Sequence, residues 1–168
     1  MPARLKCVDP NRPLRFSRAY AAFARTRVAR WISIHLMWKL DPHVMRLTGG
    51  RFGMGLVLPT AVLETRGAKT GAVRRNVVIY FHDGDRVTIV ASHLGLDRHP
   101  GWFHNLCANP DVTFGGFAMR AEAISDDAER TRLWALADTL FPPYAMYRDQ
   151  AAQADRTIPI VQLTRKDP

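Results

Sequence analysis

The chain has 168 residues, of which 47% are hydrophobic and 23% charged, so it is sized for one globular domain and its composition excludes general disorder. Cys7 and Cys107 lie 100 residues apart and no secretory h-region follows Met1, which argues against a disulfide scaffold and export and predicts a cytoplasmic location. The longest stretch without Asp, Glu, Lys or Arg is Phe52 to Leu63, 12 residues. A membrane-spanning helix needs about 20.

The net charge of +9 is confined to the first third of the chain. Residues 1–51 hold 11 Lys or Arg and two Asp or Glu, whereas residues 52–168 hold 13 of each sign. A nucleic-acid domain ordinarily spreads its basic residues over the folded surface, so this distribution argues against nucleic acid as a partner. It predicts a basic arm over residues 1–50 and a near-neutral core domain over residues 51–168.

The arm has the pattern of an amphipathic helix. Between Phe16 and His35, apolar residues recur at near-helical spacing and most arginines fall on the remaining arc. Two interpretations stay open. The helix packs on its own domain, or it lies on an anionic membrane surface, an interface that suits both aromatic rings and arginines.

Beyond the arm, the hydrophobic pattern shortens to that of strands. Helices are expected over residues 100–108 and from Asp126, where Asp126 to Glu129 resembles a capping box, to near Phe141. Strands that run in groups, with helices inserted between them, predict an antiparallel α+β barrel rather than a doubly wound sheet. Six short strands are expected, with turns at residues 82–85 and 115–116: 57–65, 76–81, 86–92, 111–114, 119–124 and 158–163.

The loop between the first two predicted strands has the composition of an anion site. Gly67 and Gly71 permit a tight backbone that points N–H groups at an anion, and Lys69, Arg74 and Arg75 supply positive charge. The spacing is not that of a Walker motif, and no helix is predicted after it. An ordinary basic loop remains the alternative.

Two further clusters predict parts of a binding site. Residues 91–106 combine a strand end, a glycine-containing loop and a helix start bearing the pair Trp102-Phe103, which suits a planar ligand. Tyr144 and Tyr147 share one face of a short helix, where they either border a pocket or serve as packing residues. No metal site is predicted, because four metal-capable side chains near the helix start repeat no ligand spacing: His93, His99, His104 and Cys107.

Four motifs stand out in chain order: Gly67 to Gly71 with Arg74 and Asn76, Val90-Ala91-Ser92, Pro100 to Leu106 with Ala108 to Pro110, and Asp155 to Val161. Together they resemble the deazaflavin (F420)-dependent nitroreductase and F420H2-dependent quinone reductase family of actinobacteria, and the resemblance covers residues 57–164. It implies a split β-barrel of the FMN-binding type that binds coenzyme F420, an 8-hydroxy-5-deazaflavin with a phosphate and an acidic tail.

The resemblance also implies roles for individual residues. Ser92, Tyr147 or solvent is expected to deliver a proton, and Ile79, Tyr144 and Tyr147 to contact the substrate. Ile79 stands where the nitroimidazole-reducing type has a tyrosine, and His93 where it has a lysine, so the substrate pocket is expected to be reshaped. The expected coenzyme contacts are Lys69, Thr70, Gly71, Arg74, Asn76, Val77, Val78, Ala91, Ser92, His93, Gly101, Trp102, Phe103 and Asn105.

The expected function is hydride transfer from reduced F420 to a lipophilic electrophilic acceptor, namely a quinone, an enone or a nitro compound. Because the coenzyme supplies the chemistry, the lack of a recognisable catalytic dyad agrees with this function. A basic arm on the inner face of the membrane would hold the pocket near such acceptors. The alternatives are an FMN-dependent split-barrel oxidoreductase and a coenzyme or lipid carrier without turnover, and the oligomeric state is left open.

Overall fold

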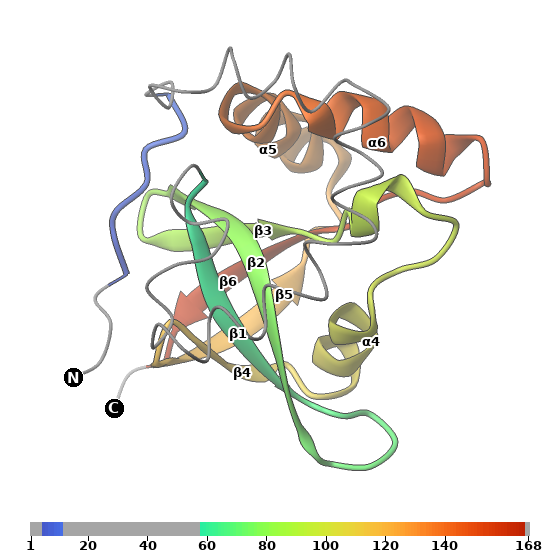
Figure 1. Cartoon of the computed structure of the whole chain (residues 1–168). Helices are drawn as coiled ribbons and strands as arrows, with labels where there is room; N and C mark the ends of the chain where they lie inside the picture. The colour runs from blue at the N-terminus through green and yellow to red at the C-terminus, as the bar shows by residue number, and fades with distance from the viewer. Residues whose placement is uncertain (1–4, 12–57, 167–168) are drawn as a thin grey trace.

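A six-stranded antiparallel barrel forms the centre of the protein (Figure 1). The computed structural model describes residues 5–11 and 58–166. The strands follow the order β1-β2-β3-β6-β5-β4 around the barrel, and β4 pairs with β1 to close it. This confirms the predicted α+β split barrel. The elements are β1 (Thr60–Arg66), β2 (Val73–Asp83), β3 (Arg86–Val90), η3 (His93–Gly95), α4 (Gly101–Ala108), β4 (Asp111–Phe114), β5 (Phe117–Ala123), α5 (Asp127–Leu140), α6 (Pro143–Ala152) and β6 (Ile160–Arg165).

The turn signals in the sequence are confirmed. Gly84 joins β2 to β3 at φ 60°, and Gly115 and Gly116 join β4 to β5 at φ 55° and 87°, a left-handed region that favours glycine. The predicted capping box opens α5, where the Asp126 carboxylate accepts a hydrogen bond of 2.7 Å from the Glu129 N–H. The strand predicted over residues 76–81 is too short, because β2 already begins at Val73.

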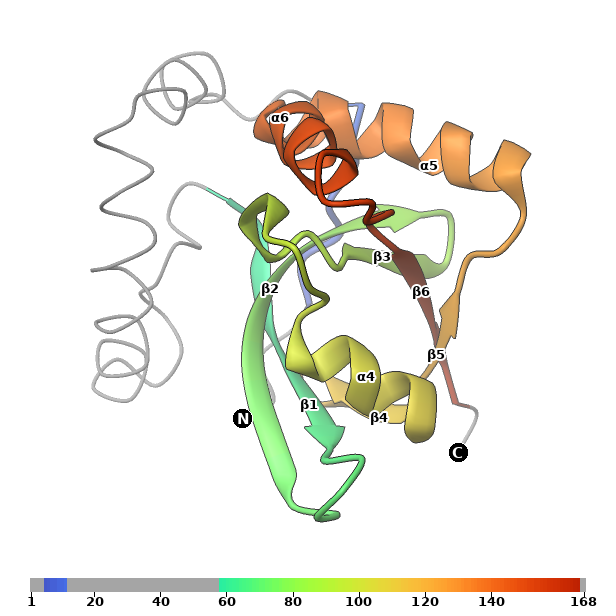
Figure 2. The ribbon, with the colours of Figure 1, turned by 90° about the vertical axis from the view of Figure 1, so that its right-hand side faces the viewer.

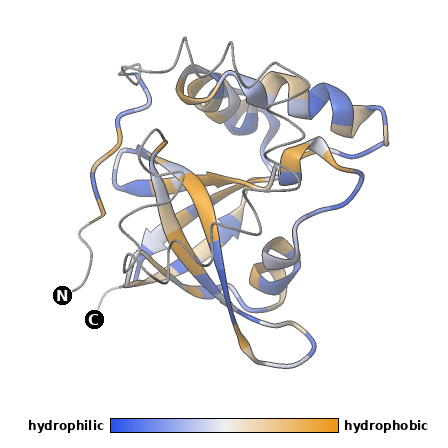
Figure 3. Cartoon of the chain, in the orientation of Figure 1, coloured by the Kyte–Doolittle hydropathy of each residue, from blue (hydrophilic) through white to orange (hydrophobic). Residues whose placement is uncertain are grey.

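The register of β1 on β2 decides which side chains share a face. Asn76 lies opposite Leu63 and Arg74 opposite Thr65, so these side chains share the sheet face that Val78 turns to the barrel interior, with Arg74 exposed beyond its end. Val77 and Ile79 point outward. Along β2 the residues change from hydrophilic near the β1–β2 turn to hydrophobic in the middle of the strand (Figure 3).

The alternation of inward and outward side chains along the strands produces two hydrophobic cores. The first fills the barrel and includes Tyr80, Phe114 and Trp102 of α4. The second lies between the outer face of the barrel and the helices α5 and α6, and includes Phe81 and Leu133. Figure 1 shows α5 and α6 together across one end of the barrel, with α4 at a separate position, where it packs against β1 and β5.

Residues 5–11 form a strap across the barrel. The Val8 N–H donates to His82 Nδ1 at 3.1 Å, the His82 N–H donates to the Val8 carbonyl at 2.8 Å, and the Tyr80 hydroxyl donates to the Lys6 carbonyl at 3.0 Å. Leu5 packs so closely on Gly115 that a Cβ there would lie 2.7 Å from the leucine. The start of the predicted arm therefore packs on the barrel.

The rest of the predicted arm, including the helix expected between residues 16 and 35 and the boundary near residue 50, lies outside the described residues. Within residues 5–11 and 58–166, no helix combines the length and hydrophobicity needed to cross a membrane.

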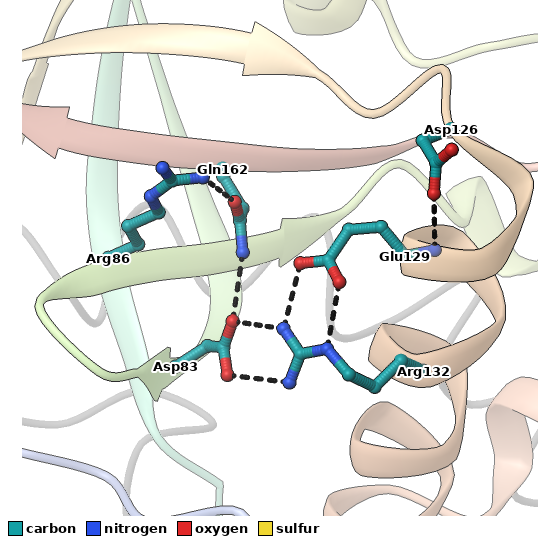
Figure 4. A network of polar contacts seen from close by, with 6 residues as sticks. All are labelled: Asp83, Arg86, Asp126, Glu129, Arg132 and Gln162. Carbon is teal, nitrogen blue, oxygen red and sulfur yellow. Dashed lines mark hydrogen bonds and ion pairs between the residues drawn. The ribbon is translucent and has the colours of Figure 1, made fainter.

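A polar network fixes α5 to the barrel (Figure 4). Arg132 donates to both carboxylate oxygens of Asp83 at 2.9 and 2.5 Å and also pairs with Glu129 on its own helix. Gln162 of β6 donates to Asp83 at 3.1 Å and accepts from Arg86 at 2.8 Å. The hydrogen bonds from Arg132 hold the pKa of Asp83 below its ordinary value. The network thus joins the β2–β3 hairpin, β6 and α5.

Thr88 offers a test of the packing beneath the helices. Thr88 is 0% exposed, and its hydroxyl has no hydrogen-bond partner among residues 5–11 and 58–166. Thr88→Val keeps the shape and removes the unsatisfied hydroxyl, so we expect about 1 kcal/mol of added stability and a Tm higher by about 2–4 °C. Thermal unfolding followed by circular dichroism measures the change. The exposed Thr164→Val serves as control, and a lower Tm for Thr88→Val would contradict the analysis.

Candidate functional site

The β1–β2 turn, residues 67–72, is closed by its own backbone. The Gly67 N–H donates to the Ala72 carbonyl and the Gly71 N–H to the Gly67 carbonyl, both at 2.8 Å. Gly71 has φ 67°, and a Cβ on Gly67 would lie 2.9 Å from Thr70 Oγ1. The Thr70 hydroxyl accepts from the Ala72 N–H at 3.3 Å. Both glycines are therefore required by the shape of the turn.

Asn105 of α4 holds the turn in place. Its Oδ1 accepts from the Ala68 N–H at 3.0 Å, and its Nδ2 donates to the hydroxyl of the buried Thr65 at 3.1 Å. Asn105 was expected to contact the coenzyme, whereas its side chain bridges α4, β1 and the turn. Sequence reasoning missed Thr65. The signal that identifies it is its position on β1 opposite Arg74, on the same face.

Positive charge gathers at the turn without being neutralised. The side chains of Lys69 and Arg74 are exposed, and neither forms a hydrogen bond or ion pair with another residue of the described chain. The Arg66 side chain is also exposed and without a partner in the described chain, but on β1 it lies on the face of Glu64. The neighbouring Arg75 points to the opposite face and pairs with Glu64 at 2.6 Å. Unpaired cations beside a tight turn are the chemistry that binds phosphate. The structure thus places Arg74 and Arg75 on opposite faces of β2, whereas the sequence analysis treated both as sources of positive charge for one anion site.

The aromatic pair at the start of α4 is split between core and site. Trp102 is 7% exposed and packs inside the barrel, so only its backbone N–H remains for a ligand. Phe103 is partly buried, with its ring 5.1 Å from that of His99. A Cβ on Gly101 would meet nothing within 4 Å, so the start of α4 has open space. Ala91 and Val78, also expected at the coenzyme, have buried side chains.

Arg156 holds the segment that leads from β3 to α4. It is 7% exposed. Its Nη2 donates to the Ala91 carbonyl at 2.5 Å and its Nη1 to the carbonyls of Ser92 at 3.1 Å and Leu96 at 2.5 Å. Its Nε donates to His99 Nδ1 at 3.1 Å. Arg156 and His99 were not among the predicted site residues, although Arg156 belongs to one of the resembling motifs.

Ser92 and Tyr147, the two expected proton donors, come from neighbouring elements. Ser92 precedes η3, and η3 packs on α6 so closely that a Cβ on Gly95 would lie 2.9 Å from the Tyr147 carbonyl oxygen. The Ser92 hydroxyl has no hydrogen-bond partner within the described chain. His93, at φ 47°, has its Nδ1 3.0 Å from the Arg98 carbonyl.

The three residues expected at the substrate lie on the second hydrophobic core. Ile79 and Tyr147 are partly buried at its edge. Tyr144 is 3% exposed and packs edge-on against Trp134 and Phe141, with ring centroids 5.9 and 5.0 Å away. Burial raises the pKa of the Tyr144 phenol. Its position supports the packing interpretation for Tyr144 and leaves Ile79 and Tyr147 as candidate contacts.

The predicted site residues follow β2. Figure 2 shows the β1–β2 turn, α4, the short turn η3 and α6 in succession along this strand. The turn supplies the charge, α4 and η3 supply a partly polar middle, and Ile79 and Tyr147 supply an apolar end. In the described part of the chain, no group of three His, Cys, Asp or Glu residues is placed to hold a metal ion.

Comparison with known proteins identifies what the chain resembles. A family model described as F420H(2)-dependent quinone reductase matches residues 37–165. An F420H(2)-dependent quinone reductase of Mycobacterium tuberculosis is 35% identical over 149 residues, which cover 83% of this chain and 99% of that protein. A homologous protein of Mycobacterium bovis, whose name states the same activity, matches to the same extent.

Two solved structures are similar to the chain. One, titled as an F420-H2 dependent reductase, has a TM-score of 0.54 and 32% identity, and the match covers 62% of this chain and 93% of that one. The other, described as a domain-swapped dimer, has a TM-score of 0.56 and 29% identity, covering 80% and 98%.

His99 makes the stability of this region depend on pH. Burial, followed by the positive charge of Arg156, lowers the pKa of His99, and its Nδ1 must be unprotonated to accept from Arg156. The unfolded chain binds the proton more readily, near pH 6.5, so stability is present above that pH and is lost as pH falls below it. We expect the free energy of unfolding to fall between about pH 7.5 and 5.5.

His99→Gln isolates the contribution of this residue, because glutamine offers an acceptor oxygen that does not titrate. Urea unfolding of both proteins at the two pH values measures the difference. We expect a smaller loss for His99→Gln, and the part that remains includes His82, whose pKa is also lowered by burial. Equal losses in both proteins would show that His99 does not contribute.

Proposed function

The chain belongs to the F420H(2)-dependent quinone reductase family, and on that premise we propose that it binds reduced coenzyme F420 along β2 and reduces a lipophilic quinone. The observation that carries the proposal is the β1–β2 turn. There, the exposed side chains of Lys69 and Arg74, without a partner among the described residues, stand beside two glycines that shape the backbone. These are the groups that a phosphate and an acidic tail require.

The residues along β2 fit the coenzyme. Lys69 and Arg74 would hold the phosphate and tail, since no described carboxylate competes for them. The open start of α4 at Gly101, with the Phe103 side chain, suits the edge of a planar ring. When bound, the reduced deazaflavin supplies the hydride, and the chain supplies position and exclusion of water.

The acceptor is proposed to lie at the apolar end of the site. Ile79 and Tyr147 offer partly buried surface at the edge of the second hydrophobic core, and the Tyr147 backbone packs on η3. Such a surface suits a quinone ring better than a charged molecule. Ser92 has a hydroxyl without a hydrogen-bond partner in the described chain, so its proton is available to the reduced acceptor. Tyr147 or solvent are the other donors, and enones and nitro compounds are the other electrophilic acceptors that this surface suits.

Titration with F420 and FMN in parallel, followed by turnover, tests the proposal. We expect saturable quenching of fluorescence on titration with F420 but not with FMN. We also expect a lipophilic quinone, such as a menaquinone analogue, to oxidise reduced F420. Binding of FMN instead would keep the fold and the phosphate site but change the electron donor. Tight binding of F420 without oxidation by any acceptor would favour a carrier.

Arg74 and Arg75 form a matched pair for testing the phosphate site. Arg74→Ala and Lys69→Ala remove unpaired cations, and we expect each to raise the Kd for F420 about tenfold, the effect of losing one charge-assisted hydrogen bond. Arg75→Ala removes an adjacent cation that pairs with Glu64 on the other face, so its Kd should stay within about twofold of the wild type. Equal effects at positions 74 and 75 would contradict the assignment.

The basic arm is proposed to hold the site near an anionic membrane, where lipophilic quinones reside. Support comes from the charge alone, since residues 1–51 carry the whole surplus of +9. We expect the protein to sediment with vesicles containing phosphatidylglycerol and to be released by about 0.5 M salt, which screens surface charge. Equal sedimentation with neutral phosphatidylcholine vesicles would contradict the proposal.

A further inference from the structure

Arg156 is a buried cation whose bonds go to neutral groups. Its guanidinium meets three backbone carbonyls and one imidazole nitrogen, and no ion pair joins it to a carboxylate of the described residues. Asp97 acts on it only at longer range, and burial lowers its pKa. Burying a charge is costly unless its donors are satisfied. Because its donors are satisfied by these neutral groups, Arg156 holds the three backbone carbonyls and the imidazole in place.

The four bonds converge on one segment, residues 91–99. Ala91 and Ser92 follow the last residue of β3, Leu96 follows η3, and His99 precedes Pro100, the N-cap residue of α4. Arg156 itself lies between α6 and β6. It therefore fixes both ends and the middle of a segment that carries Ser92 and His93 and leads into the start of α4.

The segment needs such a clamp because its backbone is strained. His93, Leu94 and Gly95 adopt φ values of 47°, 57° and 74° in succession. Left-handed backbone at a residue other than glycine costs about 1–3 kcal/mol and persists only where surrounding contacts enforce it. On one side the segment packs on Tyr147 through Gly95. On the other it is held by Arg156.

We propose that Arg156 is a positioning residue, which fixes Ser92, His93 and the start of α4 relative to the β1–β2 turn and so sets where the deazaflavin ring stands relative to the acceptor. This inference rests on the proposed function. The turn anchors the charged part of the coenzyme through Lys69 and Arg74, independently of Arg156. Loss of the clamp should therefore misplace the ring while the phosphate remains bound.

Lysine cannot replace Arg156 in this role. The guanidinium donates in three directions, from Nη2 to Ala91, from Nη1 to Ser92 and Leu96, and from Nε to His99. An ammonium group keeps the charge but offers donors from a single nitrogen. Arg156→Lys thus separates the geometry of the clamp from its charge.

The experiment compares coenzyme affinity with turnover. For Arg156→Lys we expect kcat to fall about 100-fold, the effect of a misplacement near 1 Å, while the Kd for F420 changes less than about threefold. Lys69→Ala should show the reverse pattern, a raised Kd with a smaller change in kcat. Amide hydrogen exchange without coenzyme should show faster exchange over residues 92–99 in Arg156→Lys.

Arg148→Met is the matched control for a merely structural effect. Arg148 also ties α6 down, through two bonds of 2.7 and 2.6 Å to Asp138 and a position 4.2 Å over the Trp134 ring. Within the described residues, none of its hydrogen bonds, ion pairs or ring contacts reaches residues 91–99. At a comparable loss in Tm, we expect Arg148→Met to keep kcat within about threefold of the wild type. An equal fall in kcat for both variants would overturn the proposal.

The remaining outcomes are also decisive. His99→Leu removes one of the four bonds of Arg156 and replaces Arg156→Lys as the test variant if the latter fails to fold. We expect it to lower kcat several-fold while the Kd for F420 stays unchanged. Turnover by Arg156→Lys or His99→Leu at the rate of an active wild type would overturn the positioning role alone. Failure of the wild type to bind F420 would overturn the proposed function and the inference with it.

Discussion

The alternation of side chains along β2 is the constraint on which the site depends. One long strand carries Arg74 and Asn76 on its inner face beside the β1–β2 turn, and Ile79 on its outer face at the edge of the second hydrophobic core. A shift of one residue in the β1–β2 register would exchange the paired Arg75 for the unpaired Arg74 and turn Ile79 into the barrel. The fold prevents that shift because Val78 and Tyr80 fill the interior core on the same strand. Packing energy and ligand position are therefore set by the same register.

Side-chain bonds to backbone groups shape the two irregular segments beside that strand. Asn105 holds the β1–β2 turn through the Ala68 N–H, and Arg156 holds residues 91–99 through three carbonyls. Neither segment has a sheet ladder or a long helix to satisfy its polar groups, so these bonds supply what regular structure supplies elsewhere. Both segments meet at α4, which carries Asn105 and begins at Gly101, two residues after His99. Its placement therefore couples the charged end of the site to the middle.

Local patterns sufficed for the barrel and for part of the site. Strand alternation, the glycine turns and the Asp126 cap could be predicted because each depends on neighbouring residues. The roles of Arg156, Thr65 and His99 could not, because they arise from contacts between residues 40 to 65 positions apart in the chain. The same reason explains Trp102 and Tyr144. An aromatic pair or a tyrosine pair marks a hydrophobic position, but only tertiary packing decides that Trp102 enters the barrel core and Tyr144 the second core.

The distribution of charge along β2 separates binding from chemistry. The unpaired cations stand at the β1–β2 turn, whereas the surface near Ile79 and Tyr147 is apolar. A charged coenzyme can then be bound through its phosphate and tail without placing a cation where a neutral acceptor must fit. A charged side chain at the acceptor end would retain water around it and so disfavour the binding of a quinone there. Arg156 is the exception, a cation behind the middle of the site. Its guanidinium donates its hydrogen bonds to backbone carbonyls within the protein. The surface in front of it therefore remains available to a planar ring.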